Sequence, residues 1–149
     1  MTSNISNPAI TSLEGVLSIN LATFSEPTGD SLTVVQAKQD VPFSIARIFY
    51  IYACGEGCER GAHAHRQAEQ VFIAISGKFS LGVTNGFEST EYVLQQPNRA
   101  IYVPAMIWTR VYDFSKDAVC LVLTNLPYDE GDYIRHWGEY LATGGKGTL

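Results

Sequence analysis

The sequence predicts an all-β protein of antiparallel strands with one short helix near its C-terminus. Short apolar runs alternate with turn residues, at intervals close to the roughly 8–12 residues typical of a β-sandwich or barrel. Asn85-Gly86 lies between two such runs and is a strong hairpin signal, because this dipeptide tolerates positive φ. Helical spacing of apolar residues appears only at residues 133–141, where Asp129 or Asp132 could cap the first turn.

The expected strands follow one another along the chain. Residues 45–53 are rich in Ile, Phe and Tyr, which favour strands. Residues 71–75 are continuously apolar and are followed by Ser76-Gly77, after which residues 78–83 alternate between apolar and polar. The full set of expected strands is 15–24, 32–36, 45–53, 64–76, 78–83, 91–94, 100–103, 108–114 and 119–124.

Size and charge narrow the class of protein. A chain of 149 residues fits one domain, 1–149, in which we expect residues 1–12 and 142–149 to be loosely ordered. Hydrophobic residues make up 46% and charged residues 17%, which is typical of a globular protein. The net charge of -5 argues against nucleic-acid binding and against a polybasic membrane anchor. No apolar run approaches the ~20 residues of a membrane span, and residues 1–11 do not resemble a signal peptide.

Two of the three histidines, His63 and His65, are two residues apart. Residues i and i+2 of a strand point to the same face, so the two imidazoles would project together with the small Ala64 behind them. Glu69 shares their parity and would face the same way on a regular strand. Three interpretations stay open. The first is a metal site of two imidazoles and a carboxylate, and the second is proton transfer by neutral imidazoles. The third is a pair of surface or core histidines whose hydrogen bonds are satisfied and which have no chemical role.

The cysteines give a prediction about the compartment. Cys54, Cys58 and Cys120 are odd in number and lack the spacing of a disulfide framework, so we expect reduced thiols in the cytoplasm. Cys54 and Cys58 also precede the histidine pair, which would suit zinc. The residues between them, Gly55-Glu56-Gly57, are typical of a flexible loop and disfavour that alternative.

Longer strings resemble a known family. Gly57, His63, His65 and Glu69 have the spacing of the first cupin motif, with Gly77 as its closing glycine. The chain more specifically resembles the cupin sugar 3,4-ketoisomerases that act on dTDP-4-keto-6-deoxyglucose. This likeness covers roughly residues 30–141, and its most specific strings are Arg60-Gly61-Ala62-His63-Ala64-His65 and Tyr128-Asp129-Glu130-Gly131-Asp132-Tyr133-Ile134-Arg135.

The resemblance implies a fold, an assembly and a reaction. The fold would be a jelly-roll β-barrel of the cupin type, and two copies would form a homodimer with exchanged N-terminal strands. The site would need no metal and no other cofactor, and a dTDP-linked keto-sugar would enter the barrel mouth. His63 and His65 match the catalytic histidines. Either ring could take the proton from carbon 3, and the sequence leaves their order open.

Five further residues are candidate substrate-binding residues. Arg47 and Arg60 are candidates for the pyrophosphate, because guanidinium groups match phosphate oxygens. Glu69 could fix the tautomer of one imidazole. Tyr102 and Trp108 could stack on the sugar or base, although aromatic side chains more often pack in a core or at a dimer interface.

Four positions depart from the family pattern: Gly29, Phe49, Thr109 and Tyr112. Gly29 stands where an arginine is usual and Phe49 where a tyrosine is common, which would remove a phosphate contact and a hydroxyl. Two alternative functions follow. One is a metal-dependent cupin enzyme that uses His63, His65 and Glu69, against which Thr109 occupies the usual position of a further histidine. The other is a cupin that binds a nucleotide sugar without turning it over.

Overall fold

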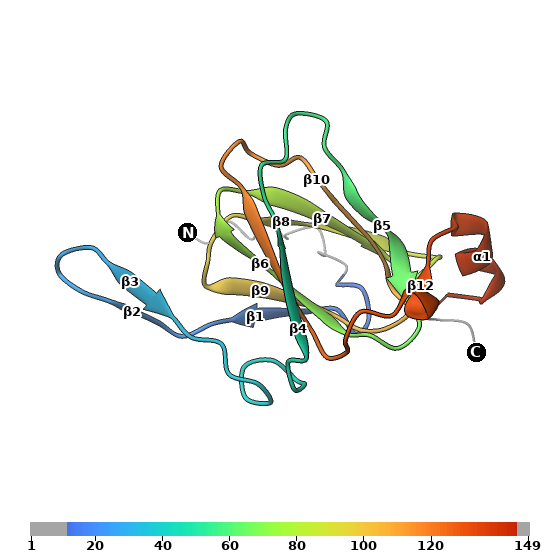
Figure 1. The fold of residues 1–149 in the computed structure, drawn as a ribbon, viewed down its shortest axis with the longest axis horizontal. Coiled ribbons are helices and arrows are strands. Elements are labelled where there is room, and N and C mark those ends of the chain that lie inside the picture. The colour runs from blue at the N-terminus through green and yellow to red at the C-terminus, as the bar shows by residue number, and fades with distance from the viewer. Residues whose placement is uncertain (1–11, 146–149) are drawn as a thin grey trace, which may run out of the picture.

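A computed structural model describes residues 12–145 of the chain. Five strands form the first sheet: β1 (Leu17–Asn20), β4 (Arg47–Ile51), β6 (Gln70–Ser76), β9 (Arg99–Val103) and β11 (Val119–Thr124). Five more form the second sheet: β5 (Arg60–His65), β7 (Phe79–Thr84), β8 (Ser89–Leu94), β10 (Trp108–Tyr112) and β12 (Tyr133–Ile134). A separate hairpin of β2 (Thr23–Ser25) and β3 (Ser31–Thr33) projects from the body of the molecule (Figure 1).

The two sheets face each other as an antiparallel jelly-roll barrel that is not closed. The strand orders are β1-β9-β6-β11-β4 and β12-β5-β10-β7-β8, and every strand pair is antiparallel. β4 is an edge of the first sheet, and β12 covers only the C-terminal half of β5. The prediction of an all-β fold with a short C-terminal helix is confirmed.

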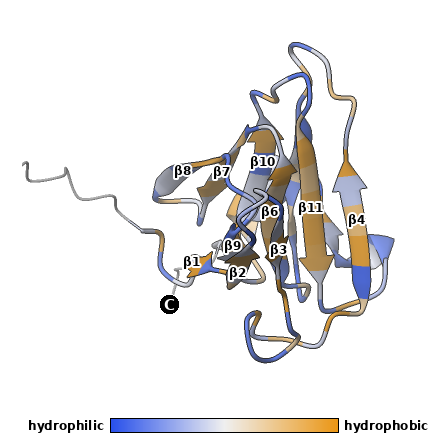
Figure 2. Cartoon of the chain, turned by 90° about the vertical axis from the view of Figure 1, so that its left-hand side faces the viewer, coloured by the Kyte–Doolittle hydropathy of each residue, from blue (hydrophilic) through white to orange (hydrophobic). Residues whose placement is uncertain are grey.

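The main core lies between the sheets. Phe72, Phe79 and Val122 are almost completely buried there. A second apolar cluster covers the outer face of the first sheet, where Val41 and Phe43 pack against β6 and β11. β6 is therefore buried on both faces, which explains its continuous apolar run. Figure 2 shows the same pattern on β11, which is apolar along most of its length.

The predicted hairpin turn at Asn85-Gly86 is confirmed. It joins β7 to β8, and Gly86 has a φ of 96°. The Asn85 side chain stabilises the turn, because its Oδ1 accepts hydrogen bonds from the backbone N–H groups of Phe87 and Glu88, both at 2.8 Å.

The C-terminal segment differs from its prediction. A short 3-10 helix, η1 (Glu130–Asp132), comes first, Tyr133–Ile134 then forms β12, and the α-helix α1 (Trp137–Ala142) begins later than expected. Tyr133 and Ile134 pair with β5 and leave the helical register. Asp129 caps η1 and not α1, whose N-cap residue is His136. The expectation of loose termini falls mostly outside the described residues.

The prediction of three reduced thiols is wrong. Cys54 and Cys58 form a disulfide, because the tight turn through the two intervening glycines brings their Cα atoms to 5.6 Å. Cys120 is a free, buried thiol on β11. Among residues 12–145, no helix has the length and apolar character that crossing a membrane requires.

Candidate active site

A bulge in β5 sets the direction of the histidines. Opposite β10, His63 pairs with Thr109 and Gly61 pairs with Arg110, so Ala62 is an extra residue without a partner. Gly61 and Ala62 have φ values of 85° and 58°, which are in the left-handed region that only glycine adopts readily. Such bulges bend a strand and redirect the side chains that follow.

His63 and His65 lie beside each other, with ring centroids 5.0 Å apart and ring planes at 88°. Tyr133 of β12 contacts both rings, at centroid distances of 4.8 Å and 4.4 Å. The two imidazoles differ in exposure. His63 lines a cavity, whereas His65 is 5% exposed and is not among the residues that line it.

Asp132 is the carboxylate that meets a histidine. Its Oδ2 lies 3.0 Å from His65 Nδ1 and also accepts from the Ala68 N–H, while its Oδ1 accepts from the Gln67 N–H at 2.7 Å. Because a carboxylate only accepts, Nδ1 of His65 carries the hydrogen and Nε2 keeps its lone pair. The sequence motif that contains Asp132 does not indicate that this carboxylate meets His65, which lies 67 positions earlier.

Both imidazoles are held neutral. Burial, followed by the neighbouring His65, lowers the pKa of His63 from 6.5 to about 4. Burial also lowers the pKa of His65, and the opposing effect of Asp132 does not overcome it. At neutral pH each ring therefore offers an unprotonated nitrogen, which is what a proton acceptor requires.

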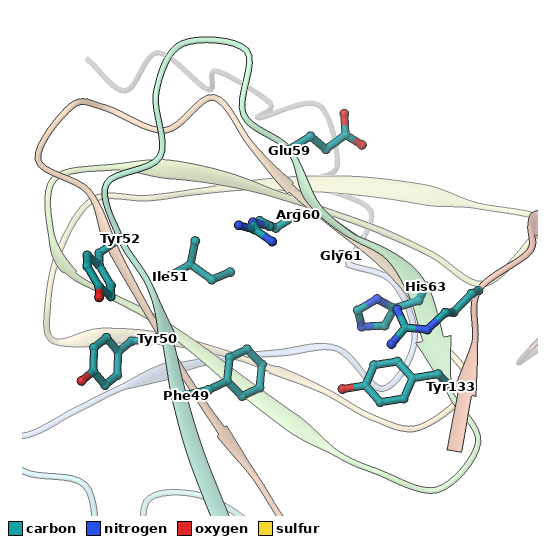
Figure 3. A pocket seen from close by; sticks show the side chains of 10 residues that line it. Phe49, Tyr50, Ile51, Tyr52, Glu59, Arg60, Gly61, His63 and Tyr133 are labelled. Carbon is teal, nitrogen blue, oxygen red and sulfur yellow. The ribbon is translucent and has the colours of Figure 1, made fainter. Parts of the chain in front are cut away.

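The cavity has a volume of about 810 Å³ and lies between the edge strand β4 and the N-terminal half of β5. Figure 3 shows Phe49, His63 and Tyr133 facing one another across it. Arg60 extends over the same space, and among the described residues it has no salt-bridge partner. This mouth therefore combines a neutral base with an uncommitted positive charge.

Two further arginines surround the histidines. Arg135 lines the cavity, stacks on Tyr133 at 4.2 Å, and holds Glu130 through two hydrogen bonds of 2.6 Å and 2.9 Å. These bonds lower the pKa of Glu130 to about 2. Arg47 is half-buried, stacks on Phe49 at 5.0 Å, and has a buried Nε without a hydrogen-bond partner.

Of the five predicted binding residues, only Arg60 lines this cavity. Arg47 lies beside it, stacked on Phe49, and the other three lie elsewhere. Glu69 lies in the turn after β5, where strand parity no longer applies, and it bonds to the Tyr102 hydroxyl and to Asn125 Nδ2. Tyr102 also packs in the cluster on the outer face of the first sheet. Trp108 is 7% exposed and packs against the C-terminal helix.

The alternative of a metal centre finds no ligand set in the described part of the chain. No group of three or more His, Cys, Asp or Glu side chains is placed to hold an ion within residues 12–145. Glu69 is bound to Tyr102 and Asn125, and Thr109 stands opposite His63. The two sulfur atoms of the zinc alternative are bonded to each other.

Known proteins resemble the chain over most of its length. Residues 14–144 match the protein family FdtA, described as WxcM-like, C-terminal. The chain is 36% identical over 110 residues to the TDP-4-oxo-6-deoxy-alpha-D-glucose-3,4-oxoisomerase of Aneurinibacillus thermoaerophilus, which covers 74% of this chain and 79% of that protein.

Solved structures agree with this likeness. A 3,4-ketoisomerase from Helicobacter canadensis superimposes with a TM-score of 0.83 at 32% identity, covering 87% of this chain and 96% of the other. A mutant 3,4-ketoisomerase from Thermoanaerobacterium thermosaccharolyticum, in complex with TDP-4-keto-6-deoxyglucose, gives a TM-score of 0.88 at 30% identity, with coverages of 93% and 99%.

Proposed function

The chain belongs to the FdtA family of WxcM-like C-terminal domains, and on that premise we propose that it is a TDP-sugar 3,4-ketoisomerase. Its substrate would be TDP-4-keto-6-deoxyglucose, the sugar named for two of its relatives. The observation that carries the proposal is a neutral histidine, His63, which lines an open cavity beside a second histidine bonded to a carboxylate.

The reaction needs a base and no change of redox state. The proton on carbon 3 of a 4-keto sugar is acidic because it adjoins the carbonyl. Its removal gives an enediolate, and its return to carbon 4, with transfer of the hydroxyl proton from oxygen 3 to oxygen 4, gives the 3-keto isomer. General acid–base assistance contributes about 10²–10⁴-fold to such steps.

We assign the carbon proton to His63, because this imidazole lines the cavity and its lowered pKa keeps it unprotonated. His65 is buried and therefore acts as a positioning residue, held by Asp132 and in edge contact with His63. The hydroxyl of Tyr133 faces the cavity next to His63 and would donate to the developing oxyanion.

The diphosphate would bind where the arginines converge. Arg60 lines the mouth without a salt-bridge partner among the described residues, and its guanidinium group can bind phosphate oxygens in a bidentate manner. Arg135 lines the same cavity but is committed to Glu130. We therefore expect Arg60 to contribute more to TDP affinity than Arg135 does.

We further propose a homodimer formed through the β2–β3 hairpin. Phe24 and Leu32 are paired across its strands and are 63% and 59% exposed. An isolated two-stranded hairpin is marginally stable in water, so this apolar pair favours contact with a second copy. Phe24→Asp should yield monomers in light scattering, whereas Phe87→Asp, which changes an equally exposed turn residue, should leave the dimer intact. Dimers of Phe24→Asp would contradict this interface.

A cytoplasmic location also stays a proposal. The argument from reduced cysteines fails at Cys54 and Cys58, which are paired. The remaining support is the substrate, since TDP-linked sugars are the substrates of the relatives and nucleotides are kept inside cells.

Incubation with TDP-4-keto-6-deoxyglucose in deuterated buffer tests the function. We expect the 3-keto product with deuterium at carbon 4, and deuterium at carbon 3 of recovered substrate. His63→Asn should abolish both signals, whereas His136→Asn, which changes an exposed histidine, should keep them. A folded wild-type protein that gives neither product nor exchange would contradict the proposal.

A further inference from the structure

The Cys54–Cys58 disulfide spans the loop that joins β4 to β5. The cavity lies between these same two strands, and its lining includes Tyr52 on one side of the bond and Glu59 and Arg60 on the other. The disulfide is therefore built into the rim of the cavity.

The two sides of this rim are held in different ways. On the β5 side, Arg60 pairs with β10, and Glu59 forms a 2.6 Å ion pair with Arg110. On the β4 side, the ladder with β11 ends at Ile51, so the chain beyond it has no strand partner. The disulfide is the covalent link that ties this unpaired end of β4 to the better-anchored β5.

The loop inside the disulfide has little stiffness of its own. It contains Gly55 and Gly57, and its internal backbone hydrogen bond runs from Cys58 N–H to the Gly55 carbonyl at 3.0 Å. Ala53, directly before Cys54, has a φ of 55°, which is unfavourable for a residue with a Cβ. Without the sulfur–sulfur bond, Ala53 would be free to relax and Tyr52 would lose its fixed place at the rim.

We propose that the Cys54–Cys58 pair is a redox-sensitive clasp of the cavity mouth, whose reduction weakens nucleotide-sugar binding; the identity of that ligand rests on the proposed function. The partner would be a dithiol reductant of the thioredoxin type. Disulfides in reducing compartments are usually transient and responsive rather than permanent. His63, His65 and Asp132 lie beyond the clasp, so the chemical step itself should persist in the reduced state.

Burial determines which sulfur reacts first. Cys54 is 7% exposed, whereas Cys58 is partly exposed. A reductant thiolate attacks the Cys58 sulfur, the disulfide breaks, and Cys54 leaves as a thiolate that takes up a proton. In the mixed disulfide, Cys58 is bonded to the first sulfur of the reductant. The second thiol of the reductant attacks that first sulfur, and Cys58 is released as a thiolate that takes up a proton. The protein gains two electrons and two protons, and the reductant becomes its disulfide.

The test compares oxidised and reduced protein, with the double variant Cys54→Ser/Cys58→Ser as a permanently open form. Alkylation after denaturation should label one cysteine, Cys120, in oxidised protein and all three after treatment with dithiothreitol. Amide exchange in residues 52–60 should quicken on reduction, and TDP should bind about fivefold more weakly. The double variant should match the reduced wild type in any redox state, with KM raised and kcat retained.

A second control isolates the clasp from other effects of reduction. Cys120→Ala removes the only described cysteine outside the loop and should leave the redox response unchanged. Three reactive thiols in air-oxidised protein would overturn the proposal, as would equal amide exchange at residues 52–60 in both states. Failure to bind TDP in either state would instead count against the nucleotide-sugar function, and the exchange measurement would still decide the clasp.

Discussion

His65 and Asp132 are joined by a 3.0 Å hydrogen bond between Nδ1 and Oδ2, although they are 67 positions apart in the chain. Asp132 also accepts from the backbone N–H groups of Gln67 and Ala68, directly after β5. One carboxylate therefore fixes both the tautomer of an imidazole and the turn that follows it. The remaining nitrogen of His65 is buried without a hydrogen-bond partner.

Asp132→Asn should damage this arrangement. The substitution replaces one carboxylate oxygen with an NH₂ group, which donates hydrogen bonds and does not accept them. If this group faces His65, the ring must change its tautomer. If it faces the backbone, a hydrogen bond from the backbone N–H is lost. We expect kcat to fall by about 10–100-fold and the free energy of unfolding by about 1–3 kcal/mol. Glu69→Gln, which changes a carboxylate that contacts neither histidine, is the matched control. Wild-type kcat in Asp132→Asn would contradict the positioning role.

Acid should inactivate the enzyme at an unusually low pH. The pKa of His63 is lowered from 6.5 to about 4, so the neutral base persists well below pH 6.5. In the free enzyme, kcat/KM should stay constant from neutral pH down to about pH 5 and fall as His63 becomes protonated near pH 4. A fall centred near pH 6.5 would show that His63 is not held neutral by burial.

The free energy of unfolding should also decrease as the pH falls. The unfolded chain protonates His63 near its ordinary pKa of 6.5, whereas the folded chain does so near 4, so the unfolded state binds more protons between these values. The contribution of neutral His63 to the free energy of unfolding is fully present above pH 6.5 and is lost as pH falls through 4. Its maximum is about 3 kcal/mol. His63→Asn should flatten this dependence in denaturant titrations between pH 7 and 4. The remaining slope should come from His65, whose pKa is also lowered, and below about pH 5 from the carboxylates Glu130 and Glu59, whose pKa values are lowered from 4.5.

The sequence was informative where a pattern is local. The apolar alternation and the Asn85-Gly86 turn predicted strands that the structure contains, and the i, i+2 spacing placed His63 beside His65. It failed where long-range pairing decides. Tyr133 resembles the start of a helix in sequence, but it pairs with His65 as β12 and thereby enters the site.

Strand parity also cannot tell which face of a sandwich is the inside. Tyr102 was expected to stack on the sugar or base and Glu69 to fix an imidazole. The two residues instead bond to each other at the first sheet, and Tyr102 packs in its outer cluster. The spacing of Cys54 and Cys58 indicated a possible disulfide, which the odd number of cysteines in the chain had argued against. Two thiols four residues apart with glycines between them can close a tight loop without any wider disulfide framework.

Gly77→Ala should cost stability and spare the chemistry. Gly77 has a φ of 63°, and an added Cβ would lie 2.7 Å from the Ala118 Cα and would also meet the Ser115 hydroxyl. We expect a loss of about 2–4 kcal/mol in chemical denaturation, with KM and kcat unchanged in the folded fraction. Gly55→Ala is the control, because its Cβ would meet nothing within 4 Å and its φ is not in the left-handed region. Equal stability of the two variants would refute the steric argument.

Gly61→Ala should instead damage the chemistry, because Gly61 forms the bulge that directs His63. Its φ is 85°, and an added Cβ would lie 3.0 Å from the Thr109 carbonyl oxygen on β10. Relief of that contact moves β5 away from β10 and shifts the His63 ring, and a misplacement of about 1 Å costs on the order of 100-fold in rate. Ala62→Gly is the control, since glycine accepts the φ of 58° at that position and the bulge is kept. Steady-state kinetics should show kcat falling in Gly61→Ala far more than in Ala62→Gly, and equal values would mean that the bulge does not position the base.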